Sequence, residues 1–201
     1  MTTIGSVKIN EADLGILFGS AARAGVLGVF VTDPRRAYYQ RQLDETTGLG
    51  LRAVQRELER FVSMGLLFRR SEGKRAYYQI DTEHPLFPEL RALVLKAADT
   101  HGRLHGTLGL DASIRLAFLD GRGKRLLVVS DETVSLPEEV SEHFEIVYMP
   151  TREFLSQLEH DPRSLDAYLR EGEDLLGRRE DIVWRRIEVA GFDVRKAKGV
   201  L

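Results

Sequence analysis

Between residues 50 and 62 the apolar positions recur at the spacing of an α-helix. The apolar stripe consists of Val54, Leu58, Phe61 and Val62. The opposite stripe, at i, i+3, i+4 and i+7, consists of Arg52, Gln55, Arg56 and Glu59. This pattern predicts a helix that is packed on one side and presents polar, mainly basic side chains on the other. Because arginine can pair with guanine and glutamine with adenine, the polar stripe is a candidate for contacts with bases in a major groove.

The neighbouring segments predict the rest of a winged helix-turn-helix unit. A strand begins at Tyr38, and a helix from Gln40 to Thr47 is closed by Gly48, which can adopt the left-handed conformation of a helix end. After residue 65 the pattern changes period, and residues 66–70 and 75–80 flank a turn at 71–74, which predicts a β-hairpin. This hairpin is the predicted wing. The rim of the hairpin is expected to carry four cations that are candidates for phosphate contacts: Arg69, Arg70, Lys74 and Arg75.

The pentapeptide Arg-Ala-Tyr-Tyr-Gln occurs twice, at residues 36–40 and 75–79. Each copy lies where a winged unit has a strand, so both are expected to be β-structure. The repetition is explained more simply by two β-prone segments than by a duplication. Arg36 and Arg41, beside the first copy, are further candidates for DNA contacts.

A preceding helix is predicted from Ala21 to Val31, with Ser20 as its N-cap and the residues 33–34, Asp-Pro, as its end. The Gly-Ser pair at 19–20 resembles the loop with which nucleotidyltransferases hold a triphosphate. That motif requires a pair of carboxylates shortly afterwards to bind Mg²⁺, and the next acidic residue here is Asp33. Ser20 is therefore interpreted as a cap and Arg23 as a surface or DNA-facing residue.

The charge of the chain is unevenly distributed. The net charge is −2, yet residues 35–75 hold 10 Lys/Arg against 5 Asp/Glu, and residues 98–201 hold 15 against 20. The modest positive excess fits a dimer that reads a specific site better than a protein that coats DNA. With no Cys and with five His that lack ligand spacing, no metal site or cofactor is expected; the pair His101 and His105 is assigned to a solvated helix end. No membrane span or signal peptide is evident, which predicts a cytoplasmic protein.

The second half of the chain alternates between strands and helices, which predicts an α/β or α+β domain. The expected order places a winged helix domain at 1–85, a linking or dimerisation helix within 86–111 that runs from Pro88 to about His105, and the second domain at 112–201. Residues 1–10 are expected to be a loose start or an edge strand. Strands are expected at 114–119, 126–130, 145–149 and 175–176. Helices are expected at 136–144, at 162–170 and at 181–189, and a further helix is expected to begin after Thr151, which is its predicted cap. The basic tail at 195–198 is expected to be frayed.

The whole layout resembles an ArsR-like winged helix fused to a nucleotidyltransferase-like domain, closely over residues 14–97 and weakly after 112. The motifs that carry the resemblance are Leu-Phe-Gly-Ser-Ala-Ala-Arg at 17–23, Thr-Gly-Leu at 47–49, Ala-Val-Gln-Arg-Glu-Leu at 53–58, Gly-Leu-Leu at 65–67, Tyr-Tyr at 77–78 and His-Pro-Leu-Phe-Pro-Glu-Leu-Arg-Ala-Leu at 84–93. The resemblance implies a dimeric, DNA-binding transcriptional regulator.

The second half departs from the enzyme pattern. Gly123 and Arg125 stand where the resemblance would place the two metal-binding carboxylates, and without anionic ligands Mg²⁺ cannot be held for phosphoryl transfer. Asp120 and Asp131 are the nearest acids and are interpreted as turn residues at strand ends. The expected protein is therefore not an enzyme, and its degenerate second domain would serve dimerisation, sensing of a protein or small-molecule effector, or partner binding. A nucleotidyltransferase and a protein-binding winged-helix adaptor remain as alternatives.

Overall fold

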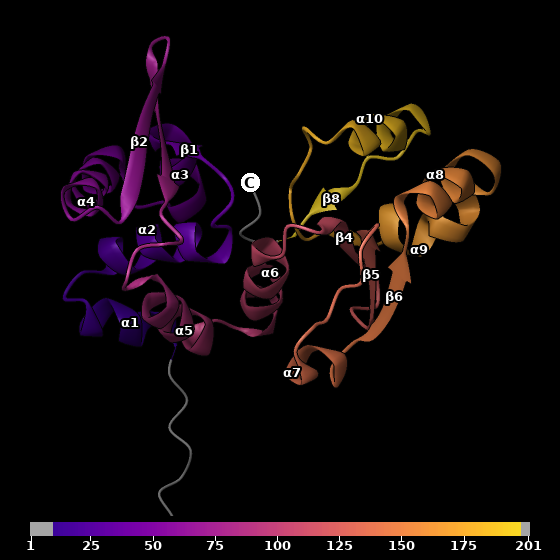
Figure 1. The fold of residues 1–201 in the computed structure, drawn as a ribbon, viewed down its shortest axis with the longest axis horizontal. Helices are drawn as coiled ribbons and strands as arrows, with labels where there is room; N and C mark the ends of the chain where they lie inside the picture. Colours follow the sequence, from indigo (N-terminus) through magenta and orange to yellow (C-terminus); the bar gives the residue numbers. More distant parts are fainter. Residues whose placement is uncertain (1–9, 198–201) are drawn as a thin grey trace, which may run out of the picture. The chain divides into compact units, whose positions relative to one another are not determined.

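A computed structural model describes residues 10–197 and divides the chain into two compact units, residues 1–106 and 107–201 (Figure 1). Both units combine helices with a β-sheet, so the chain is of mixed α+β class, as predicted. The boundary lies within the segment 86–111 that the sequence assigned to a linking helix. The start of the chain, expected to be loose or an edge strand, lies outside the described residues apart from Asn10, which caps the first helix.

The first unit contains helices packed beside a three-stranded antiparallel sheet of order β1-β3-β2. Its elements are α1 (Glu11–Leu17), α2 (Ala21–Thr32), β1 (Tyr38–Tyr39), α3 (Gln40–Thr47), α4 (Leu51–Ser63), β2 (Leu67–Glu72), β3 (Arg75–Ile80) and α5 (Phe87–Ala97). The predicted α2, α3, α4 and the hairpin are confirmed, and Ser20 Oγ accepts the amide N–H of Arg23 as the predicted cap. The sequence assigned no helix to α1, which begins with a capping box between Asn10 and Asp13.

The single helix predicted from residue 88 to about 105 is wrong. The structure has α5 and a second helix, α6 (Thr100–Leu110), separated at Ala98, whose ψ of 151° is extended. Asp99 Oδ1 then accepts the amide N–H of Gly102 at 2.8 Å and so caps the new helix. The prediction that His105 belongs to a solvated helix end is also wrong, because this side chain is buried in α6.

The second unit is built on a five-stranded sheet of order β6-β5-β4-β7-β8. Its elements are β4 (Ile114–Leu119), β5 (Arg125–Ser130), α7 (Glu138–Ser141), β6 (Glu145–Met149), α8 (Thr151–His160), a 3₁₀ turn (Pro162–Leu165), α9 (Asp166–Leu169), β7 (Glu173–Asp174), α10 (Ile182–Val189) and β8 (Arg195–Lys196). The strands β4 and β5 form an antiparallel hairpin, whereas β6 runs parallel to β5.

Several boundaries predicted for the second unit are corrected. The strand expected at 175–176 is β7, two residues earlier, and the helix expected at 136–144 is limited to one turn. The tail at 195–198 is not frayed over its described part, because Arg195 and Lys196 pair in parallel with β7. Thr151 is the first residue of α8 rather than its cap, and its hydroxyl donates to Asp131.

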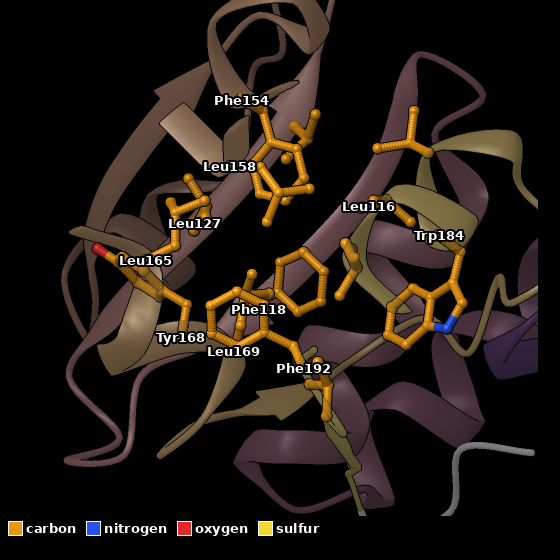
Figure 2. Packing of buried hydrophobic residues seen from close by; sticks show 14 of the residues in the cluster. Leu116, Phe118, Leu127, Phe154, Leu158, Leu165, Tyr168, Leu169, Trp184 and Phe192 are labelled. Atoms are coloured by element: carbon orange, nitrogen blue, oxygen red, sulfur yellow. The ribbon is translucent and has the colours of Figure 1, made fainter. Parts of the chain in front are cut away.

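The core of the second unit lies on one face of the sheet, beneath α8, α9 and α10 (Figure 2). Phe118 of β4 lies between Phe154 of α8 and Trp184 of α10, with ring centroids 6.2 Å and 6.0 Å from its own. All three side chains are fully buried. Burial of such aromatic side chains is the main source of stability for a unit of this size. In the part of the chain that the structure describes, none of the helices combines the length and apolar character that a membrane span requires.

Candidate nucleic-acid interface

The turn between α3 and α4 is fixed by two glycines and one leucine. Gly48 and Gly50 have φ angles of 63° and 82°, in the left-handed region that favours glycine. Leu49, between them, approaches α2 so closely that a Cβ added to Gly25 would lie 3.2 Å from its Cδ1. The turn is therefore anchored to α2, and this contact sets the direction in which α4 leaves it.

The polar stripe of α4 is exposed, as predicted. Arg52, Gln55, Arg56 and Glu59 are all exposed, whereas Val54, Leu58 and Phe61 on the other side are buried. Three of these four exposed side chains already have partners on the helix: Gln55 Nε2 donates to Glu59 Oε1 at 3.1 Å, and Arg56 Nε lies 3.6 Å from Glu57 Oε1. Among the residues that the structure describes, Arg52 has no ion-pair partner. It is the stripe's most available cation.

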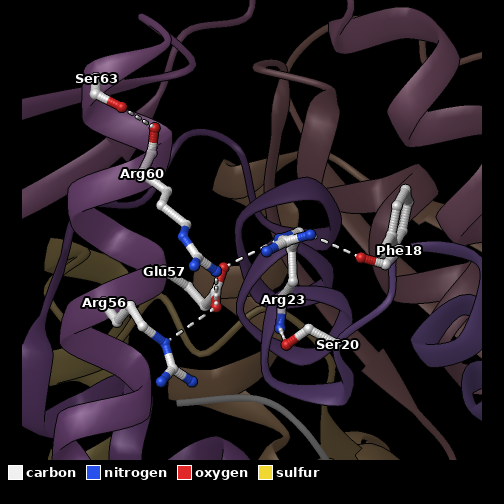
Figure 3. Close-up of polar contacts among 7 residues, drawn as sticks. All are labelled: Phe18, Ser20, Arg23, Arg56, Glu57, Arg60 and Ser63. Carbon is white, nitrogen blue, oxygen red and sulfur yellow. Dashed lines mark hydrogen bonds and ion pairs between the residues drawn. The ribbon is translucent and has the colours of Figure 1, made fainter.

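Glu57 is a buried carboxylate on α4 that the sequence analysis missed (Figure 3). Its side chain is 0% exposed and contacts three guanidinium groups: Arg23 of α2 at 3.1 Å, Arg60 at 2.8 Å and Arg56 at 3.6 Å. Burial alone would raise the pKa of Glu57, but the hydrogen bonds from Arg23 and Arg60 outweigh burial and hold that pKa below its ordinary value. The carboxylate thus stays charged and joins α4 to α2.

Arg23, predicted to be a surface or DNA-facing residue, is engaged by contacts within the first unit. Its Nε donates to Glu57 and its Nη1 donates to the carbonyl oxygen of Phe18 at 2.7 Å. One third of the side chain remains exposed, but both hydrogen bonds hold the guanidinium against the buried side of α4. Arg23 therefore supports α4 from within the unit.

The four cations predicted on the wing do not form one rim, because side chains alternate between the two faces of a strand. The face toward the helices carries the buried Leu67, Tyr78 and Ile80, and Arg69 shares it. Arg70 and Arg75 lie on the opposite face, and Lys74 lies in the turn. All four side chains are exposed.

The cations also differ in their contacts. Arg70 pairs with Glu72 at 3.0 Å, and the guanidinium of Arg75 lies 5.0 Å from the centre of the Tyr39 ring. Among the described residues, Arg69 and Lys74 have no such partner. These two are therefore the wing cations best placed to bind an added phosphate.

The two weaker candidates beside β1 are engaged locally. Arg36 is half-buried, with its guanidinium 5.5 Å from the centre of the Tyr38 ring. Arg41 is exposed and pairs with Glu45 one turn further along α3 at 3.0 Å. An exposed i, i+4 pair contributes little to stability, so Arg41 can exchange Glu45 for a phosphate at small cost.

The two acidic residues of the second unit considered as metal ligands, Asp120 and Asp131, accept hydrogen bonds from backbone amides. Asp120 is buried in the turn between β4 and β5, where its Oδ1 accepts the N–H groups of Lys124 and Arg125 at 2.7 Å and 2.9 Å. Asp131 accepts both the amide and the hydroxyl of Thr151 at the start of α8. These contacts agree with the interpretation of both acids as turn residues. Within residues 10–197, no group of three or more His, Asp or Glu side chains is arranged to hold a metal ion.

Replacing Asp120 by asparagine is expected to destabilise the second unit by about 1 kcal/mol, because the amide accepts the same two hydrogen bonds without the charge. Burial raises the pKa of Asp120, but the backbone amides of Arg125 and Lys124, with the Arg125 guanidinium, outweigh it and set that pKa below its ordinary value. The charged carboxyl therefore adds stability above its ordinary pKa and loses it as the pH falls. Urea unfolding followed by Trp184 fluorescence should show that wild type has the higher free energy of unfolding at neutral pH and that this difference disappears in acid. An equal difference in the free energy of unfolding at neutral and at acid pH would contradict this role.

No family model, curated protein or solved structure matches the chain. The resemblance to ArsR-like regulators and to nucleotidyltransferases stays a prediction, and the interface is argued from its own geometry.

Proposed function

We propose that the chain is a sequence-specific DNA-binding transcriptional regulator whose first unit is a winged helix-turn-helix. The observation that carries the proposal is the exposed polar stripe of α4, Arg52, Gln55 and Arg56, on a helix held from behind by α2 and followed by a projecting hairpin. A helix of 13 residues fits a major groove, and its arginine and glutamine side chains match the edges of guanine and adenine. Arg69 and Lys74 on the hairpin would bind phosphates beside that groove.

The regulator is proposed to act as a homodimer. The helices α1 and α5 pack together within the first unit and lie at the end opposite the hairpin tip (Figure 1). They expose large apolar side chains, with Ile16 at 80%, Leu17 at 64% and Leu93 at 37%. A contiguous apolar patch marks a protein interface more often than scattered side chains do, and these three residues are proposed to form such a patch. A second copy bound there would leave both α4 helices accessible to successive turns of one duplex.

The second unit is proposed to be a degenerate nucleotidyltransferase-like domain that no longer catalyses, and that serves dimerisation, sensing or partner binding. The hydrogen bonds of Asp120 and Asp131 to backbone amides support this, since both carboxylates have a structural role at a strand end. Incubation with labelled nucleotide and Mg²⁺ tests it. An adduct that disappears in Asp120→Asn or Asp131→Asn, while the variant remains folded, would establish the enzyme instead.

The proposed function is tested by selecting duplexes from a random library with the full chain and measuring their binding by gel shift. We expect selected duplexes to share a motif and to bind at least about a thousandfold more tightly than random duplex, as specific sites do. If no duplex is retarded, even from a genomic pool, the proposal fails and a protein-binding role for the winged unit is favoured.

Lys74→Ala is expected to weaken selected and random duplexes by the same factor, because a phosphate contact carries no sequence information. It should also reduce the slope of log affinity against log salt concentration by roughly 1, since one fewer counterion is released. Lys124→Ala, which removes an exposed lysine from the turn between β4 and β5, is the matched control and should leave the slope unchanged. A loss confined to the selected motif would instead assign Lys74 to base recognition.

A further inference from the structure

The two copies of the repeated pentapeptide pair with each other in the sheet of the first unit. Tyr38 lies opposite Tyr78, and Tyr39 lies opposite Tyr77, in the antiparallel pairing of β1 with β3. Since the side chains alternate, Tyr38 and Tyr78 are buried toward the helices, whereas Tyr39 and Tyr77 are placed on the other face and only half-buried. The repeat therefore puts an aromatic pair on the side of the sheet that faces away from the helices.

We call this side the outer wing face and define it by five side chains: Tyr39, Phe68, Arg70, Arg75 and Tyr77. The Tyr39 and Tyr77 rings meet edge to face, with centroids 5.9 Å apart. Phe68 is 61% exposed, whereas phenylalanine side chains are more often buried. Because Arg70 is opposite Tyr77 and Phe68 is two residues before Arg70 on β2, Phe68 lies diagonally across from the tyrosine pair.

We infer that the outer wing face binds single-stranded DNA, with bases stacking on Phe68 and the tyrosine pair. The phosphates contact Arg75 and Arg70, and Arg70 exchanges its exposed partner Glu72 for a phosphate at small cost. Proteins that bind single strands combine aromatic side chains with cations that follow the backbone, and this sheet face has both. The guanidinium of Arg75 over the Tyr39 ring presents a further plane on which a base can stack. This surface differs from the α4 stripe, so the inference does not depend on duplex recognition.

The side-chain amide of the face does not read a 2′-hydroxyl, so single-stranded DNA satisfies the interactions that the face offers. A protein distinguishes RNA through hydrogen bonds to the 2′-hydroxyl. Gln79, which shares the face, already donates its amide N–H groups to the carbonyl oxygens of Pro34 and Arg35. The remaining attraction is stacking and charge, which needs no 2′-hydroxyl.

The test measures the fluorescence anisotropy of a labelled 20-nucleotide single-stranded DNA of mixed sequence, titrated with the full chain at low salt. Phe68→Ala is expected to weaken binding roughly five- to a hundredfold, the effect of losing one stacked base, and Phe68→Trp should restore it. Met64→Ala is the matched control, because it removes a similarly exposed apolar side chain at the end of α4 and should change nothing. Arg52→Ala should leave single-strand binding intact, which separates this surface from the duplex-reading stripe.

Three results would overturn the inference. The first is no binding of the single strand, or equal binding by Phe68→Ala and wild type when thermal unfolding shows both folded. The second is tighter binding of RNA of the same sequence, which would assign the face to RNA. The third is a loss of self-association in Phe68→Ala by size exclusion, because the face would then be a contact between copies of this chain.

Discussion

Replacing Glu57 by glutamine is expected to destabilise the first unit by about 3 kcal/mol, the low end of the effect of breaking a buried ion pair. The substitution leaves Arg23 and Arg60 without a counter-charge at a position where the carboxylate was 0% exposed. The effect falls at the low end because Arg60 is half exposed and water can solvate it. A change of this size should lower the unfolding midpoint of a unit of about 100 residues by roughly 10 °C or more.

The chain provides its own controls for this measurement. Trp184, the only tryptophan, lies in the second unit, so the unfolding transition followed by its fluorescence should be the same in the variant and in wild type. Far-UV circular dichroism should report the lower stability of the first unit. Glu59→Gln removes an exposed carboxylate from the same helix and should have little effect. Because the pKa of Glu57 lies below its ordinary value, its charge stabilises the folded state above the ordinary carboxyl pKa, and this stability is lost as the pH falls. Equal stability of Glu57→Gln and wild type at neutral pH would contradict the ion-pair role.

Glu57 also connects stability to the proposed function. It ties α4 to α2 through Arg23, and its second oxygen lies 3.6 Å from the Nε of Arg56 in the exposed stripe. A base contact requires α4 to be held at a fixed orientation, since small displacements misalign bidentate hydrogen bonds. We therefore expect Glu57→Gln to reduce discrimination between duplexes even at a temperature at which the variant is fully folded.

The interface elements could be predicted because their signals are local. The period of the apolar residues fixed the exposed side of α4, and Gly48 marked the end of α3. The buried position of Glu57 was not predicted, because a pattern of apolar residues gives no weight to a carboxylate. A usable signal was present, since residue 57 is three after Val54 and four before Phe61 and so falls on the buried side.

The errors elsewhere have equally specific causes. Treating the wing cations as one rim ignored the alternation that separates Arg69 from Arg70. The prediction of an uninterrupted helix after residue 88 did not take account of Asp99, which is a good N-cap within an apparently helical stretch. In the second unit, β7 and β8 are two residues long, too short to show any period, and their pairing depends on residues far apart in the chain.

Arg52→Ala is expected to reduce the preference for the selected duplex over random duplex by roughly five- to a hundredfold, the contribution of one bidentate contact to a base. The reason is the availability of Arg52: it is exposed and, within the described residues, has no ion-pair partner to exchange. Arg56→Ala should have an effect in the same range but a less specific one, because Arg56 also contacts Glu57. Arg52 is therefore the sharper test of base recognition.

The measurement is gel-shift competition of both variants against wild type, with Arg122→Ala as the control. Arg122 is an exposed cation in the turn between β4 and β5, and its removal should affect neither duplex beyond a small electrostatic term. Lys74→Ala supplies the contrast, since it should weaken both duplexes alike. If Arg52→Ala and Lys74→Ala lower the affinity for both duplexes by the same factor, then Arg52 contacts only the DNA backbone. The sequence would then be read elsewhere, through the shape of the duplex or through Gln55.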